Sequence, residues 1–122
     1  MMALHNQIGK IGENIAAKYL KNNSYLIIDR NYRNNFGEID IIAEKDDYII
    51  FIEVKSRSSE DYLYLAENLY YTQIEHLKNT ASYYFVEKKK DLKNIRFDLI
   101  AIKINYEKQT ADELKHFKNI ID

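Results

Sequence analysis

The chain has 122 residues, the length of one ordinary domain, and its 46% hydrophobic content excludes a wholly disordered chain. Its 18 basic and 19 acidic residues give a net charge of −1, so any nucleic-acid partner would need a local patch or a metal that offsets acidic groups. The absence of cysteine excludes a disulfide scaffold and a cysteine-based zinc site.

The chain shows no signal for a membrane or for secretion. No run of about 18 apolar residues is present, so we expect no membrane-spanning segment. The N-terminus, MMALHNQIGK, lacks the basic and then apolar pattern of a secretory signal, which favours the cytoplasm. No repeat or linker divides the sequence. We therefore expect a single domain over residues 1–122, with a core over about 4–104 and a C-terminal tail over 105–122.

The first half of the chain predicts one helix followed by three strands. Residues 4–22 carry apolar side chains at helical spacing, and residues 25–31 are short and β-branched, as in a strand. The turn signal NNFG at 34–37 follows. Residues 38–44 and 48–55 are two apolar runs on either side of KDD, a pattern that predicts a β-hairpin.

The second half predicts a helix and a further strand. Residues 60–71 are ambiguous, and their tyrosines are expected either to cover the sheet or to form a dimer contact. Residues 72–90 predict a long helix that ends in lysines, and 95–104 a last strand. TADE at 110–113 resembles a capping box and predicts a short terminal helix. The order of elements predicts an α/β fold, a mixed sheet flanked by helices.

Charged side chains interrupt the hairpin at one end only. Side chains alternate between the faces of a strand, so the apolar faces coincide if the loop has two or four residues, such as Asp46-Asp47. Asp40, Glu53 and Lys55 then emerge together where the hairpin opens. The residues expected on the apolar face are Ile39, Ile41 and Ala43 from one strand and Tyr48, Ile50, Ile52 and Val54 from the other.

Carboxylates gathered in such a place predict a metal site. Burial of a charged carboxylate costs free energy, and neighbouring carboxylates also repel each other. A divalent cation such as Mg²⁺ offsets both costs. Lys55 would then orient an attacking water or stabilise charge on a phosphate. The alternative is an exposed ion pair between Glu53 and Lys55. Glu13 lies on a helix beside Gly9 and Gly12, and is either within reach of the carboxylates or simply exposed.

Three stretches resemble a known family. GKIGENIAAKYL (9–20), NYRNNFGEIDIIAEKDDYIIFIEVKSR (31–57) and RFDLIAI (96–102) are similar to the YraN family of small bacterial proteins. That family is related to archaeal Holliday-junction resolvases and to the PD-(D/E)XK restriction-endonuclease-like superfamily. The resemblance implies a restriction-endonuclease-like sheet flanked by helices. It also implies hydrolysis of DNA phosphodiester bonds, with branched DNA as one candidate substrate, dependent on Mg²⁺ or alternatively Mn²⁺.

The resemblance assigns roles to four residues. Asp40, Glu53 and Lys55 match the metal and catalytic positions of the superfamily. Glu13 matches the helix glutamate of the resolvases and is predicted as both a catalytic residue and a metal ligand. Related resolvases act as dimers, so a homodimer is a further expectation. The alternative function is an inactive nuclease fold that binds nucleic acid or a protein partner.

Other polar residues are weaker candidates. Arg33 and Arg57 lie near the predicted site and are candidates for phosphate contact. Residues 73–77 read QIEHL where similar proteins carry a basic stretch, so Gln73 is a third candidate for contact with nucleic acid. Arg96 and Asp98 are expected to pair with each other for a structural reason. The three histidines show no metal-ligand spacing.

Overall fold

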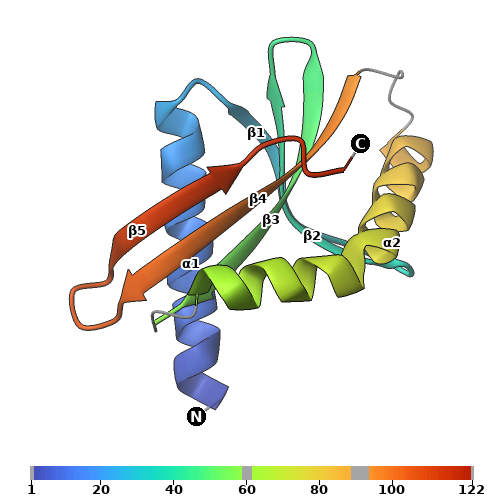
Figure 1. Ribbon diagram of the computed structural model, residues 1–122. Helices are drawn as coiled ribbons and strands as arrows, with labels where there is room; N and C mark the ends of the chain where they lie inside the picture. The colour runs from blue at the N-terminus through green and yellow to red at the C-terminus, as the bar shows by residue number, and fades with distance from the viewer. Residues whose placement is uncertain (1, 59–61, 89–93, 122) are drawn as a thin grey trace.

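The computed structural model describes residues 2–58, 62–88 and 94–121, and the side chains of 6–58, 74–88 and 94–121. Within these ranges the chain forms two helices and a five-stranded sheet (Figure 1). The elements in chain order are α1 (Met2–Asn22), β1 (Leu26–Asn34), β2 (Gly37–Lys45), β3 (Tyr48–Arg57), α2 (Tyr62–Lys88), β4 (Asn94–Asn105) and β5 (Thr110–Phe117).

The sheet is mixed and has the strand order β1-β2-β3-β4-β5. Only β3 and β4 run parallel, because α2 provides the crossover between them, and the other neighbours are antiparallel. α1 packs on one face of the sheet and α2 on the other (Figure 1). This confirms the predicted α/β fold, and the arrangement is consistent with that of restriction endonucleases. Neither helix, over the residues that the structure describes, is long and apolar enough to cross a membrane.

The central hairpin has the predicted two-residue loop. Lys45 pairs with Tyr48 and Ile41 with Ile52, so Asp46 and Asp47 alone connect the strands. Asp46 has a positive φ of 55°, which a tight two-residue hairpin turn requires. The register turns the apolar faces of β2 and β3 toward α1, where Ile41, Ala43, Ile50 and Ile52 are fully buried.

Ile39 lies on the other side of the sheet from the one predicted. It packs with Tyr32, Ile42 and Leu77 beneath α2 rather than with Ile41 beneath α1. The register between β2 and β3 runs only from Lys45 back to Ile41, although β2 itself continues to Gly37 in partnership with β1. Past Ile41 the strand no longer pairs with β3, and its twist turns Ile39 toward α2.

The capping box at 110–113 does not begin a helix. Residues Thr110–Phe117 form β5, which pairs antiparallel with β4 at the edge of the sheet. Gln109 provides the turn with a positive φ of 53°, and a register shift at Lys103 and Ile104 lets Ala111 and Leu114 both pack on the core under α1. Long-range pairing with β4 therefore outweighs the local helix signal.

A buried polar network fastens β5 and α1 to β4. Arg96 donates two hydrogen bonds of 2.9 Å to Asp98, which confirms their structural pairing. His116 Nε2 lies 2.7 Å from Asp98, and the hydroxyl of Tyr19 lies 2.8 Å from His116 Nδ1. Burial by itself raises the pKa of Asp98, but hydrogen bonds from His116, Arg96 and Asn119 outweigh it and hold that pKa below its usual value.

α1 approaches the sheet most closely at Gly12. A Cβ at this position would lie 2.7 Å from the Cβ of Ser56 and closer still to its hydroxyl, so only glycine fits. Gly9, one turn earlier, has no atom within 4 Å of the place where its Cβ would stand. Gly12 therefore sets the distance between α1 and β3, directly beside Glu13.

The two glycines predict opposite effects of the same substitution. Gly12→Ala should lower the free energy of unfolding by about 1–3 kcal/mol through overpacking against Ser56. Gly9→Ala should raise it by about 0.5–1 kcal/mol, because alanine favours the helix and nothing obstructs it. Urea denaturation of both variants measures the difference. Adding Ser56→Gly to Gly12→Ala should restore part of the loss, and a Gly12→Ala protein as stable as Gly9→Ala would contradict the close approach.

Candidate functional site

The site lies where β2 separates from β3. Beyond Ile41 the backbone of β2 no longer pairs with β3, and the side chain of Asp40 takes its place as a hydrogen-bond partner. Asp40 Oδ2 accepts a 2.7 Å hydrogen bond from the backbone N–H of Val54. The carboxylate is therefore held in the opening between the strands, beside Glu53.

Glu53 is buried in this opening and contacts Asp40. Glu53 is only 8% exposed, and its carboxyl group shares a hydrogen bond with that of Asp40. Burial raises the pKa of Glu53 well above its usual value, and the hydrogen bond and the charge of Asp40 raise it further. The charge of Lys55 opposes this shift. The two carboxyl groups are close enough to share one proton.

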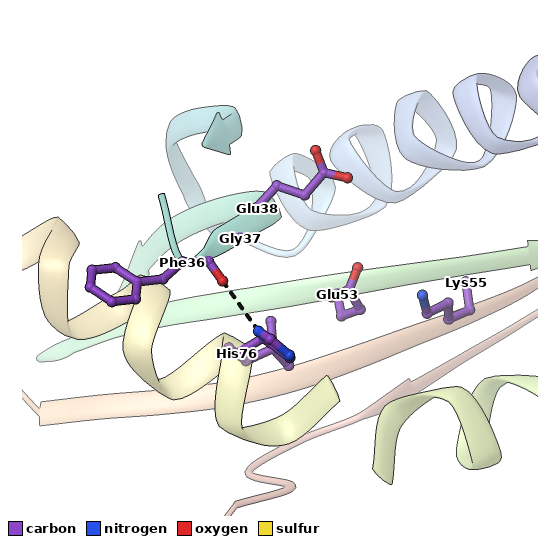
Figure 2. A pocket seen from close by; sticks show the side chains of 7 residues that line it. Phe36, Gly37, Glu38, Glu53, Lys55 and His76 are labelled. Carbon is purple, nitrogen blue, oxygen red and sulfur yellow. Dashed lines mark hydrogen bonds between the residues drawn. The ribbon is translucent and has the colours of Figure 1, made fainter. Parts of the chain in front are cut away.

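A pocket of about 330 Å³ opens beside Glu53 on the α2 face of the sheet (Figure 2). Glu53 and Lys55 project from β3, while His76 comes from α2 and Phe36 from the turn between β1 and β2. The residues that line the pocket are Phe36, Gly37, Glu38, Glu53, Lys55, His76 and Leu77. The alternation along β3 thus places Glu53 and Lys55 on one face, as the sequence predicts.

Glu13 approaches the pair from α1 and does not line the pocket. Burial raises the pKa of Glu13, and the charge of Asp40 raises it further, so the two carboxylates lie within electrostatic range. Arg30 and a hydrogen bond from Asn31 act in the opposite direction. The charge of Asp40 thus raises the pKa of both Glu13 and Glu53, and the predicted catalytic role of Glu13 stays a prediction.

The carboxylates fit a hard divalent cation only in part. Among the described side chains, no group of three or more histidine, aspartate or glutamate residues is arranged to hold a metal ion. The Asp40–Glu53 pair nevertheless supplies two adjacent oxygen donors whose mutual repulsion a cation would relieve. Mg²⁺ is often bound through one or two carboxylates and completes its coordination with water and substrate oxygens. The pair therefore supplies two of the oxygen donors that such a cation needs, and the predicted Mg²⁺ or Mn²⁺ stays a prediction.

The predicted nucleic-acid contacts differ in their positions. Arg33 is on the hairpin of β1 and β2, where it pairs with Glu38 at 2.7 Å and lines a hollow next to the pocket. Arg57 ends β3 beyond Lys55, and its guanidinium donates to the carbonyl of Ser56. Gln73 belongs to α2, but its side chain lies outside the described residues.

Most residues of the pocket were not predicted as part of a site, and His76 and Phe36 are the two with distinctive side chains. His76 has no metal-ligand spacing in the sequence, and only the folding of α2 across the sheet brings it opposite Glu53. Phe36 stands in the turn NNFG, and an exposed aromatic residue directly before GEID is a signal that could have been noticed. Both residues come from segments remote from Glu53 in the sequence.

Comparison with known sequences identifies the family. The chain matches the uncharacterised protein family UPF0102 over residues 12–102. The chain belongs to this family. This confirms the YraN resemblance, since UPF0102 and YraN denote the same family.

Relatives in the UPF0102 family match nearly the whole chain. The UPF0102 protein of Clostridium acetobutylicum is 40% identical over 98% of this chain and 97% of its own length. That of Persephonella marina is 39% identical over 93% and 92%. That of Dictyoglomus thermophilum is 41% identical over 80% and 83%. These names state the family and no activity, so the chemistry has to be argued from the site.

The raised pKa of Glu53 predicts a stability that depends on pH. A carboxyl group with a raised pKa in the folded state stabilises the fold most below its unfolded pKa of about 4.3, and this contribution is lost as pH rises through the folded pKa. The substitution Glu53→Gln removes this loss of stability at high pH. In EDTA at pH 8 the variant should melt about 4 °C or more above wild type, the shift that roughly 1 kcal/mol produces in a domain of this size.

The gain should shrink as the pH approaches 4.5, which melting curves across the pH range would measure. Glu38→Gln is the matched control, because Glu38 lines the same pocket but is exposed and paired with Arg33. It should show no such gain at high pH. A Glu53→Gln protein less stable than wild type at pH 8 would contradict a shared proton between Asp40 and Glu53.

Proposed function

We propose that this protein is a metal-dependent endonuclease of the PD-(D/E)XK type, which hydrolyses phosphodiester bonds in DNA. The observation that carries the proposal is the contact of Asp40 with the buried Glu53, which lines a pocket together with Lys55. A pair of touching carboxylates costs folding energy, and a role in holding a cation accounts for its presence. The resemblance of GEIDII and F-x-EVK to the superfamily motif supports the same chemistry.

The proposed division of labour follows from the environment of each side chain. Asp40 is fixed by the Val54 N–H and Glu53 by burial, so both carboxylates are oriented before substrate arrives. They are the residues that would hold Mg²⁺, which when bound supplies an acidified water and a polarised phosphoryl oxygen. Lys55 lies two residues after Glu53 on the same face of β3, where its ammonium group can stabilise charge on the attacking water or on the phosphate.

The reaction is a displacement at phosphorus. The oxygen of a water molecule forms a bond to phosphorus, and the bond from phosphorus to one ester oxygen breaks. The water gives its proton to bulk solvent while the Lys55 ammonium stabilises the negative charge that forms, and the departing oxygen takes a proton from solvent. His76, across the pocket from Glu53, is positioned to contact a phosphate oxygen of the same strand.

A binding module without turnover is the second candidate. The observation in its favour is that the described side chains supply two adjacent carboxylates and no third ligand. In addition, Glu75 lies near His76 on α2 where a basic residue would favour contact with phosphate, and it pairs with Lys78 at 3.9 Å. The same pocket would then bind nucleic acid or a protein partner without hydrolysis.

Two substitutions separate cleavage from metal binding. Lys55→Ala keeps both carboxylates, so it should retain metal binding and lower cleavage by about 10²–10⁴-fold. Asp40→Asn keeps an oxygen to accept the Val54 N–H but loses a charge, so it should lose both functions. Calorimetric titration with Mg²⁺ or Mn²⁺, beside a cleavage assay on duplex, single-stranded, flapped and four-way-junction DNA, measures the two effects.

Lys115→Ala is the matched control for Lys55→Ala. Lys115 follows Glu113 by two residues on β5, so the pair repeats the acid-x-Lys pattern on a strand away from Asp40. Its removal should leave cleavage unchanged. A wild-type protein that binds metal and DNA but cleaves none of these substrates would decide for the binding module.

A further inference from the structure

The turn between β1 and β2 holds an exposed aromatic ring at one end of the pocket. Phe36 is 47% exposed and lines both the pocket of Glu53 and the neighbouring hollow that contains Arg33. Figure 2 shows its ring on the far side of His76 from Glu53 and Lys55. Phe36 is therefore an apolar surface within a wall that is otherwise largely polar.

Polar contacts on both sides of the turn fix the backbone that carries the ring. The backbone N–H of Phe36 donates a 2.8 Å hydrogen bond to the side chain of Asn34, which itself donates to the carbonyl of Thr80 on α2. The carbonyl of Phe36 lies 3.4 Å from His76 Nδ1. The ring also packs at 50° against Tyr83, with the centroids 5.8 Å apart. The tip of the hairpin is thus fastened to α2, and the aromatic ring is presented without a large cost in side-chain entropy on binding.

The charges around Phe36 suit the backbone of a nucleic acid. Lys55 lies at one end of the pocket, and His76 lies between it and the Phe36 ring (Figure 2). Arg33, whose side chain is 78% exposed, lines the neighbouring hollow, where it pairs with Glu38 at 2.7 Å. A strand that crosses this wall would meet Lys55 and His76 before it reaches the aromatic ring.

We propose that Phe36 is a stacking platform for one unpaired nucleotide next to the phosphate that a cation at Asp40 and Glu53 would contact. The inference rests on the proposed function and names its substrate class: DNA with unpaired nucleotides at the cleavage site, rather than uninterrupted duplex. A base within a duplex has both faces stacked and has no face to offer, whereas an unpaired base stacks readily on an aromatic side chain. The pocket would then select its substrate through base stacking as well as through phosphate contacts.

Binding measured in Ca²⁺ tests this, because a divalent cation would offset the charge of Asp40 and Glu53 and the measurement does not depend on cleavage. Wild type should bind a duplex with a short unpaired flap or gap more tightly than the same duplex without one, at one fixed salt concentration. Phe36→Ala should reduce affinity for the flapped DNA by about 5- to 150-fold, the loss expected from one stacked base, and leave duplex affinity nearly unchanged. Phe36→Tyr should retain the preference, and Tyr48→Ala, which removes an exposed aromatic residue at the opposite end of β3, should not alter it.

A spectroscopic signal separates stacking from a structural role. With 2-aminopurine as the unpaired base, wild type and Phe36→Tyr should quench its fluorescence on binding. Phe36→Leu should keep the apolar contact with Tyr83, and hence the melting temperature, but lose the quenching. Equal affinity for flapped and uninterrupted DNA, or quenching that survives in Phe36→Leu, would overturn the proposal.

The outcomes for Phe36 and for the nuclease are separate. If wild type cleaves DNA and Phe36→Ala neither loses affinity nor alters substrate choice, the platform is wrong and the nuclease stands. If the preference for unpaired nucleotides depends on Phe36 while wild type cleaves nothing, the platform stands and the protein is a binding module.

Discussion

The contact between Asp40 and Glu53 is the constraint on which the site depends. Two carboxyl groups within hydrogen-bonding distance repel each other when both are ionised, and burial of Glu53 increases the cost. The fold accommodates them only because β2 leaves β3 at this point, so that Asp40 can accept the Val54 N–H. Had the ladder between β2 and β3 continued, a backbone group would occupy the position of the Asp40 carboxylate. The opening of the hairpin and the acidic pair are therefore one feature.

The two helices contribute to this feature in different ways. α1 packs on the face of the sheet opposite the pocket, where Gly12 lets the helix approach Ser56 and brings Glu13 within electrostatic range of Asp40. α2 closes the other side and supplies His76, and it also fastens the tip of the β1–β2 hairpin through Thr80. At the far end of α1 the network of Asp98, Arg96, His116 and Tyr19 is fully hydrogen-bonded and satisfies its charges internally. The contrast is informative, because the Asp40–Glu53 cluster holds like charges together.

The sequence predicts the parts of this structure that depend on local pattern. Alternation along 38–44 and 48–55 was sufficient for the hairpin, its two-residue loop and the shared face of Glu53 and Lys55. Local patterns gave the wrong prediction where a distant segment decides the outcome. Ile39 faces α2 instead of α1 because β2 leaves β3, and Thr110–Phe117 is a strand instead of a helix because it pairs with the edge of β4. His76 reaches the pocket only through the crossover of α2. The side chains of the tyrosine-rich segment lie outside the described residues, so the predicted dimer contact stays a prediction.

A net charge of −1 does not argue against a nucleic-acid partner once the local arrangement is considered. Asp40 and Glu53 lie in the opening of the sheet, where a cation would neutralise them, whereas Lys55 and His76 line the pocket and the charge of Glu38 is paired with Arg33. Phosphate contacts alone bind any strand and weaken steeply as salt rises. A protein with so few cations in its wall would gain more affinity from a stacked base than from a further phosphate, because stacking is insensitive to charge. This is the physical reason why an exposed ring at Phe36 matters more here than it would on a strongly basic surface.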